Sequence, residues 1–142
     1  MTILSFLDQS PIRAGSTPAE ALQETLKLAE LCDRLGYHRY WLAEHHSTGG
    51  LAGSAPEIMI GQVAGRTRNL RVGSGGVMLS HYSSLKVAES FRMLESLYPG
   101  RIDLGIGRAP GSDGLTANAL AHGPGALGIE HFPSQIRDVQ AW

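Results

Sequence analysis

Three polar side chains that can bind or transfer protons follow one apolar segment of this chain. Glu44, His45 and His46 come directly after Tyr40-Trp41-Leu42-Ala43. Histidine has an unperturbed pKa of about 6.5, so it gains or loses a proton near neutral pH. The apolar residues predict a buried strand that leaves the core and presents these groups at its end. We therefore interpret Glu44, His45 and His46 as candidate catalytic residues.

Two other roles are open for the histidine pair. His45 and His46 could bind a metal ion, but a third ligand at a recognisable spacing is missing, and we predict no metal site. They could also be structural side chains capped by their neighbours. The segment His81-Tyr82-Ser83, in the loop after the third predicted strand, is a candidate substrate or cofactor contact. The remaining histidines lack such a context and are predicted to be surface or loop residues: His38, His122 and His131.

Local patterns divide the chain into four strands that alternate with helices. Apolar segments bounded by turn residues predict strands over residues 3–7, 37–44, 69–79 and 101–107, the first of them buried. Helical spacing predicts helices over residues 18–35, 56–66 and 84–97, and another that begins at Phe132-Pro133. A loop rich in Gly, Pro and Asp is expected between the fourth strand and the last helix.

This order requires parallel strands, because each helix returns the chain to the same end of the sheet. Two α/β architectures are compatible with it: an open doubly wound sheet, or part of a (β/α)8 barrel. A whole barrel needs about 250 residues. Four βα units in 142 residues would be the N-terminal half of one.

The first predicted helix begins with a capping box and carries the single cysteine. Thr17 can accept a hydrogen bond from a free backbone N–H, and Glu20 can reach back to Thr17. Cys32 lies at helical spacing with Leu31 and Leu35, which predicts a buried, inert thiol on an apolar face. One cysteine excludes an internal disulfide and a Cys-based zinc site.

Ligand sites in both architectures form at the carboxyl ends of parallel strands. The predicted ends all carry polar groups or glycine, and they are residues 8–10, 44–46, 75–81 and 107–111. Gly73-Ser74-Gly75-Gly76 lies within a strand, where glycine marks a bulge or bend, or a close approach by another group such as a flat ring.

Arg108 is the cation at the end of the fourth predicted strand. Its guanidinium is suited to a two-pronged phosphate contact, although a surface ion pair would also explain it. Gly105 and Gly107 form part of a dinucleotide fingerprint, but Pro110 falls where the helix should begin.

The composition is that of an ordinary globular protein. Twelve basic and 13 acidic residues leave a formal charge of −1, which gives no electrostatic reason to expect nucleic acid or an anionic membrane as a partner. The sequence has no run of about 18 apolar residues and no basic segment at its start, so we expect neither a membrane span nor a signal peptide. We expect a cytoplasmic protein.

Three motifs in this order resemble the bacterial luciferase-like flavin-dependent monooxygenases. They are Trp41 to His46, Val72 to Tyr82 and Arg101 to Gly111. The likeness extends from residue 3 to the end of the chain and includes Phe132-Pro133-Ser134-Gln135, which is similar to the start of that family's fourth helix.

The resemblance implies a (β/α)8 barrel that uses reduced FMN, or the deazaflavin F420 in some relatives, at the carboxyl ends of its strands. His45 matches the family's active-site histidine near the flavin, with Glu44 and His46 flanking it. The Gly75–Gly76 peptide matches a position where relatives place a non-proline cis bond beneath the flavin ring. The cofactor-binding residues that we expect are Gly75, Gly76, Met78 and Arg108, the last near the flavin phosphate.

The chain is shorter than members of this family. Because a full barrel needs about 250 residues, residues 1–142 are predicted to form a single partial barrel domain, a truncated member that lacks full catalysis alone. A small organic substrate, O2 and a flavin reductase are the expected partners. Four strands alone would leave two free sheet edges, so we expect a homo-oligomer. The alternatives are a non-catalytic half barrel that assembles through these edges, and a nucleotide-binding α/β domain centred on Gly105 and Gly107.

Overall fold

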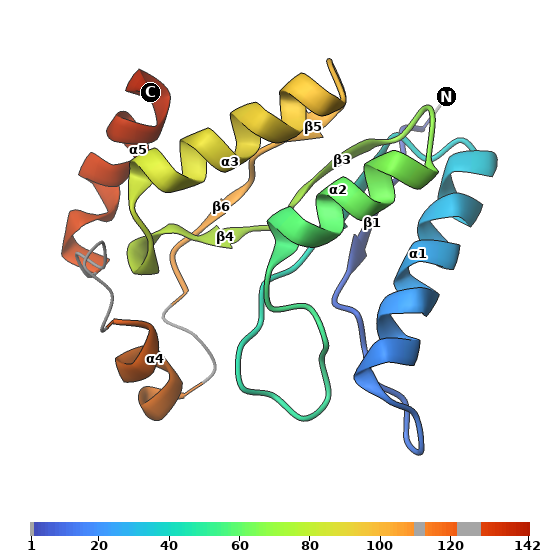
Figure 1. The fold of residues 1–142 in the computed structure, drawn as a ribbon, viewed down its shortest axis with the longest axis horizontal. Helices are drawn as coiled ribbons and strands as arrows, with labels where there is room; N and C mark the ends of the chain where they lie inside the picture. The colour runs from blue at the N-terminus through green and yellow to red at the C-terminus, as the bar shows by residue number, and fades with distance from the viewer. Residues whose placement is uncertain (1, 110–112, 122–128) are drawn as a thin grey trace.

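The computed structural model describes residues 2–109, 113–121 and 129–142. The strands are β1 Ser5–Asp8, β2 Arg39–Leu42, β3 Arg71–Ser74, β4 Val77–Met78, β5 Ile102–Asp103 and β6 Ile106–Gly107. The helices are α1 Pro18–Arg34, α2 Pro56–Arg66, α3 Ser84–Leu97, α4 Gly114–Leu120 and α5 Phe132–Ala141, with short 3-10 turns η1 Leu79–His81 and η2 Ile129–His131 (Figure 1).

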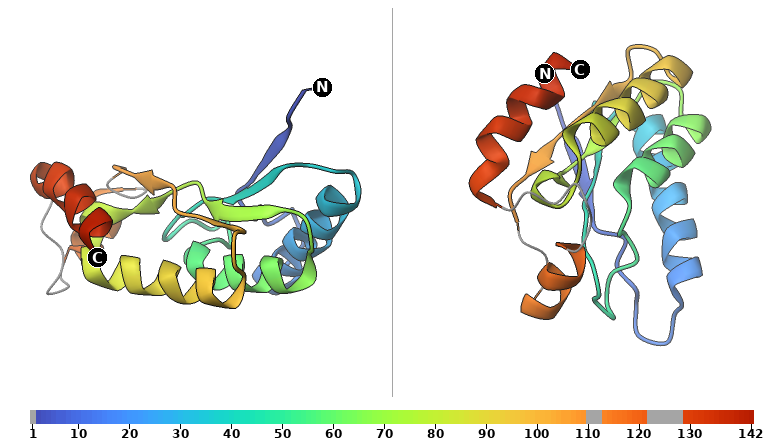
Figure 2. Two further views of the ribbon diagram at one scale, coloured as in Figure 1. Left: turned by 90° about the horizontal axis from the view of Figure 1, so that it is seen from above. Right: turned by 60° about the vertical axis from the view of Figure 1, so that its left-hand side comes forward.

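The strands form a parallel sheet whose spatial order follows the chain. The order is β1-β2-β3-β5, and β4 pairs separately with β6. Phe6, Tyr40, Val72 and Ile102 lie side by side in the register of the sheet. Helices α1, α2 and α3 lie on one face of it (Figure 2). A doubly wound sheet reverses its strand order and carries helices on both faces, so this arrangement excludes that alternative and matches the predicted half barrel.

The hydrophobic core lies between the sheet and the three helices. Tyr40 of β2 and Val72 of β3 are fully buried, and Ile60 and Val63 of α2 pack against them at helical spacing. Burial of a large aliphatic side chain contributes about 1.5–3 kcal/mol. This packing holds the ends of β2 and β3 next to each other.

Helix α1 confirms the capping box but presents a narrower apolar face than predicted. Thr17 Oγ1 accepts a hydrogen bond from the Glu20 N–H at 3.2 Å, and Glu20 Oε2 accepts one from the Thr17 N–H at 2.9 Å. Cys32 is buried, as predicted, and burial with the nearby Asp8 raises the pKa of its thiol. Leu31 and Leu35 are exposed, which corrects their assignment to the buried face.

The first strand is an edge strand, and the prediction that it is buried was wrong. Ile3, Leu4 and Leu7 are 73%, 53% and 53% exposed. Side chains alternate between the two faces of a strand. Phe6 therefore packs on Tyr40 in the helix-covered core, whereas Leu7 points to the face without helices. At this free edge of the sheet the side chains of Ile3 and Leu4 remain exposed.

The third and fourth strands are each interrupted, whereas continuous strands were predicted. β3 ends at Ser74, a cis Gly75–Gly76 peptide follows, and β4 begins at Val77. The gap between β5 and β6 lies opposite this break. The Ser74 hydroxyl bridges it, since Ser74 Oγ donates to the Gly105 carbonyl at 2.8 Å and accepts from the Gly105 N–H at 3.1 Å.

A short helix, α4, lies where only a loop was predicted after the fourth strand. Asp113 caps it and accepts a hydrogen bond from the Thr116 N–H at 2.7 Å. The sequence did not predict this helix, because the glycine and proline residues of the surrounding segment indicated a loop. The helix predicted to begin at Phe132-Pro133 is confirmed as α5.

Candidate functional site

Glu44 joins the end of β2 to the segment that follows β3. Its side chain is only 1% exposed. Glu44 Oε2 accepts a hydrogen bond from the Met78 N–H at 2.8 Å. Glu44 Oε1 lies 2.7 Å from His46 Nε2 and accepts from the Tyr82 hydroxyl at 2.6 Å. We call Glu44, His46, Tyr82 and the Met78 N–H the Glu44 network.

The hydrogen bonds of the Glu44 network indicate which atoms of His46 and Tyr82 carry protons. A carboxylate can only accept hydrogen bonds, so its three neighbours must donate, and the His46 proton is assigned to Nε2. Burial and the hydrogen bond to Glu44 raise the pKa of the Tyr82 hydroxyl, which therefore stays protonated as the donor. Glu44 and His46, both candidate catalytic residues from the sequence, thus share a hydrogen bond, and Tyr82 joins them.

His45 differs from its two neighbours because one of its ring nitrogens lacks a partner. The His45 backbone N–H donates to the Gly53 carbonyl at 2.8 Å, which fixes the main chain at this point. His45 Nδ1 is buried and has no hydrogen-bond partner among the described residues. Buried polar atoms are nearly always paired. This nitrogen is therefore a candidate to receive a hydrogen bond from, or donate one to, a bound molecule.

The glycines around the break in β3 are required by close approaches within the protein. A Cβ on Gly73 would lie 2.5 Å from the Asp103 carbonyl oxygen and 2.7 Å from Trp41 Cζ3. A Cβ on Gly76 would lie 2.9 Å from the Gly105 carbonyl oxygen. At Gly73 the neighbours are the Asp103 main chain and the Trp41 indole, and at Gly76 the neighbour is the main chain between β5 and β6.

Arg108 follows β6 at the same end of the sheet as Glu44. The residue is exposed, and it forms no ion pair with any acidic residue that the structure describes. Its guanidinium can therefore meet an anion. The dinucleotide interpretation of Gly105 and Gly107 loses support, because the strand order is not that of a doubly wound nucleotide-binding sheet. Pro110 and Gly111 lie outside the described residues.

The end of β1 is a buried structural network that sequence reasoning missed. Asp8 is 4% exposed and accepts hydrogen bonds from the Ser10 N–H at 2.7 Å and the Tyr40 hydroxyl at 2.5 Å. The Thr25 hydroxyl donates to Ser10 Oγ at 2.9 Å. Burial raises the pKa of Tyr40, and so does the contact with Asp8. These groups satisfy one another and hold β1 against β2 and α1.

Three further histidines, His38, His81 and His131, lie in the part of the chain that the structure describes. His81 belongs to η1 and packs its ring edge-on to Tyr82, at 6.5 Å between centroids. His38 and His131 are exposed, as predicted, and His122 lies outside the described residues. Within residues 2–109, 113–121 and 129–142, no group of three His, Cys, Asp or Glu side chains is placed to hold a metal ion. None of the helices in this part of the chain has the length and apolar character that crossing a membrane requires.

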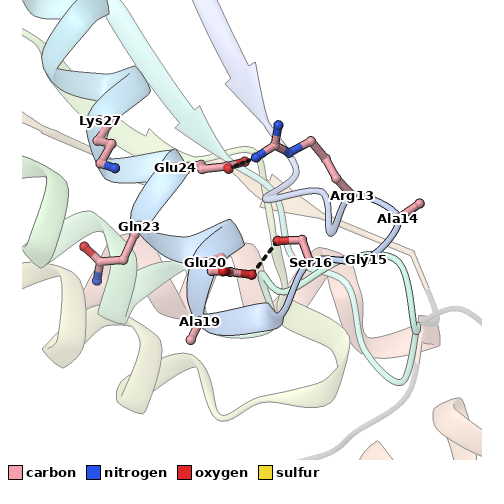
Figure 3. Close-up of a pocket in the computed structure, with 9 residues that line it drawn as sticks. All are labelled: Arg13, Ala14, Gly15, Ser16, Ala19, Glu20, Gln23, Glu24 and Lys27. Carbon is pink, nitrogen blue, oxygen red and sulfur yellow. Dashed lines mark hydrogen bonds and ion pairs between the residues drawn. The ribbon is translucent and has the colours of Figure 1, made fainter.

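A groove of about 780 Å³ lies apart from these strand ends (Figure 3). It is formed by the loop before α1 and the first turns of that helix. Its two carboxylates have partners: Glu24 pairs with Arg13, and Glu20 accepts a hydrogen bond from the Ser16 hydroxyl at 2.9 Å. None of the residues that line this groove carries a buried polar side-chain atom without a hydrogen-bond partner. Chemistry is better supported at Glu44–His46.

Comparison with known proteins identifies the family. The sequence model of the luciferase-like monooxygenases matches residues 1–123. The chain belongs to this family. It is 57% identical over 120 residues to the N-acetyl-S-alkylcysteine monooxygenase of Bacillus subtilis, which covers 84% of the chain and 36% of that enzyme. The resemblance described from the sequence motifs is confirmed.

Solved structures support the same conclusion about the fold. The crystal structure of apo-MsnO8 superposes with a TM-score of 0.91 at 46% identity, covering 99% of this chain and 42% of that one. The oxygenating constituent of 3,6-diketocamphane monooxygenase from Pseudomonas putida, solved in complex with FMN, has a TM-score of 0.81 at 20% identity and is covered to 38%. This chain spans about two fifths of its relatives, and the predicted N-terminal half of a (β/α)8 barrel is confirmed.

Proposed function

We propose that this chain supplies the N-terminal half of the active site of a flavin-dependent monooxygenase. The observation that carries the proposal is the buried, unpartnered Nδ1 of His45 at a strand end, in a chain that belongs to the luciferase-like monooxygenases. Reduced flavin, when bound, would supply two electrons to O2, of which one atom enters the substrate and the other leaves as water. The chain's own residues provide position and proton control.

His45 is the proposed catalytic residue. Its Nδ1 can hold a proton beside the reacting atoms or receive one from them, which is the chemistry of a general acid or base. The hydrogen bond from its backbone N–H to Gly53 keeps the residue in place. Glu44 and His46, also candidates from the sequence, already bond to each other and contribute to the site through the Glu44 network.

The cofactor-binding surface is proposed to consist of Gly75, Gly76, Met78 and Arg108. Gly75 and Gly76 have no side chain, so a bound cofactor could come close to their main chain wherever no other protein atoms lie against it. Met78 is held in place through its N–H by Glu44. The exposed guanidinium of Arg108 suits a flavin phosphate, which Arg binds with two parallel hydrogen bonds.

FMN is the cofactor that we propose, with F420 as the alternative. The FMN in the diketocamphane monooxygenase structure belongs to that protein, whose identity of 20% to this chain shows a common fold only. Parallel titrations of the 142-residue chain with FMN and with F420, followed by quenching of flavin fluorescence, decide between them. We expect saturable quenching with FMN at lower concentration. If only F420 gave saturable quenching, F420 would take the place of FMN as the proposed cofactor. If neither gave saturable quenching, flavin use by this chain would be contradicted.

The substrate is proposed to be a small organic molecule, and a thioether is the first to test. The 57% identical relative is named for oxidation of N-acetyl-S-alkylcysteine. The assay combines the chain, FMN, a flavin reductase, NADH and this thioether, and mass spectrometry detects the addition of one oxygen atom. Because the chain spans 36% of that relative, we expect little turnover by these 142 residues alone. Efficient turnover would show that the single partial domain suffices.

We also propose a cytoplasmic location.

A second candidate function is assembly through the free edge of the sheet. The exposed Ile3 and Leu4 before β1, and Leu7 within it, favour it, because an uncovered strand edge readily pairs with another chain. A homo-oligomer is the proposed form. Light scattering over a hundredfold range of concentration measures its mass. A monomer throughout that range would contradict assembly and leave the monooxygenase proposal unaffected.

A further inference from the structure

The Glu44 network connects segments that are far apart in the sequence. Glu44 and His46 lie directly after β2, whereas Met78 and Tyr82 follow 34 and 38 positions after Glu44. Both carboxylate oxygens are engaged by donors between 2.6 and 2.8 Å away. Charge-assisted hydrogen bonds of this length are the stronger ones in proteins. The network therefore ties the β2 end firmly to the segment that begins with β4.

We propose that Glu44 and Tyr82 are positioning residues, which hold the His46 ring in its Nε2–H form and fix the Met78 main chain. The buried Glu44 carboxylate already accepts three hydrogen bonds, so most of its lone-pair positions are used to hold its neighbours and not to react with a substrate. Tyr82 is held as a donor because its raised pKa keeps its proton.

The positions of the network members show what this arrangement controls. His45 follows Glu44 directly, and Gly76 lies two residues before Met78. Fixing Glu44 against Met78 therefore sets the separation between His45 and the Gly75–Gly76 peptide. This consequence for flavin binding depends on the proposed function, whereas the assignment of the His46 proton does not.

Histidine ring signals test the network directly. Two-dimensional ¹H–¹⁵N spectra of the labelled 142-residue chain, recorded about two pH units above the ordinary imidazole pKa, report which ring nitrogen carries the proton. We expect His46 to be protonated at Nε2 in the wild type. Glu44→Gln should shift it toward a mixture of tautomers, because the amide has one acceptor oxygen where the carboxylate has two, and its NH2 cannot accept from His46 when the oxygen accepts from the Met78 N–H. A wild-type His46 that is protonated at Nδ1, or already a mixture, would overturn the proposal.

Tyr82→Phe keeps the ring and removes one donor, so it carries the test if Glu44→Gln does not fold. We expect His46 to remain Nε2–H in this variant, and the Met78 amide to exchange with solvent about tenfold faster. Unchanged Met78 exchange would contradict a positioning role for Tyr82. The matched controls are Tyr37→Phe, at a partly buried tyrosine outside the network, and Glu89→Gln, at an exposed glutamate of α3.

Flavin affinity links the network to the proposed function. Glu44→Gln should raise the Kd for FMN by about tenfold or more, while Glu89→Gln leaves it unchanged. If FMN does not bind the wild type, the proposed function fails, and the ring-nitrogen and exchange measurements still decide on the network. If FMN binds and Glu44→Gln has the wild-type Kd, the network does not position the flavin surface.

Discussion

Gly73→Ala is the substitution for which the structure gives the most direct energetic estimate. The new Cβ would lie 2.5 Å from the Asp103 carbonyl oxygen and 2.7 Å from Trp41 Cζ3. The carbonyl belongs to the neighbouring strand and cannot rotate away. Overpacking of this kind costs about 1–3 kcal/mol, and the reduced entropy of the unfolded chain offsets about 0.4–1 kcal/mol of it. We expect a net loss of about 1–2 kcal/mol in the free energy of unfolding.

Urea denaturation followed by circular dichroism measures this loss, with Gly50→Ala as the matched control. No heavy atom lies within 4 Å of a Cβ placed on Gly50, and its φ is outside the positive range. The control should therefore be neutral or slightly stabilising. If Gly73→Ala is as stable as Gly50→Ala, β3 and β5 are not packed as closely as described. A Gly73→Ala chain that is unfolded in water would show that the loss is larger than this estimate.

Three further predictions concern the scaffold. Thr17→Ala should lower the free energy of unfolding by about 1 kcal/mol through loss of the capping box, measured by urea denaturation; an unchanged midpoint would contradict the cap. Burial acts to raise the pKa of Asp103, but hydrogen bonds from Arg71 and Arg39 outweigh it and hold this pKa below its usual value. The stabilisation by this carboxylate is therefore present above about pH 4 and is lost as pH falls through the pKa of Asp103 in the folded chain. Asp103→Asn should therefore lose less of its free energy of unfolding than the wild type when the pH is lowered. An equal loss in the variant and the wild type would refute this. The buried Cys32 thiol, with its raised pKa, should react with Ellman's reagent only on unfolding, and rapid labelling of the native chain would contradict its burial.

The order of elements was predictable because it depends on local chemistry. The capping box at Thr17, the helical spacing in α2 and the turn residues between elements are short-range signals. The motif order then identified the half barrel and the family, both of which hold. The exposure of β1 was not predictable from its apolar residues, because an edge position is a property of the whole sheet.

The candidate site was located from the sequence, but its internal contacts were not. Glu44-His45-His46 stood out as a polar group after an apolar strand. Nothing in the local pattern shows that the Met78 N–H and the Tyr82 hydroxyl converge on Glu44 from 34 and 38 positions away. The difference between His46, which is bonded, and His45, whose Nδ1 is not, is visible only in three dimensions.

The glycines of the third strand show the same limit. The sequence left two explanations, a bend in the chain or a ring against the main chain. The structure shows the break after Ser74, and it places the Trp41 indole, a ring of the protein itself, beside Gly73. The indole comes from β2, so only the register between neighbouring strands reveals it.

The central claim is that the carboxyl ends of β2, β4 and β6 form one flavin surface, and mapping FMN on the chain tests it most directly. Backbone amide signals of the ¹⁵N-labelled chain are followed during an FMN titration. The account predicts that the shifted amides cluster at His45, Gly76, Met78 and Arg108. Shifts confined to the groove between Arg13 and Lys27, or the absence of any saturable shift, would contradict it.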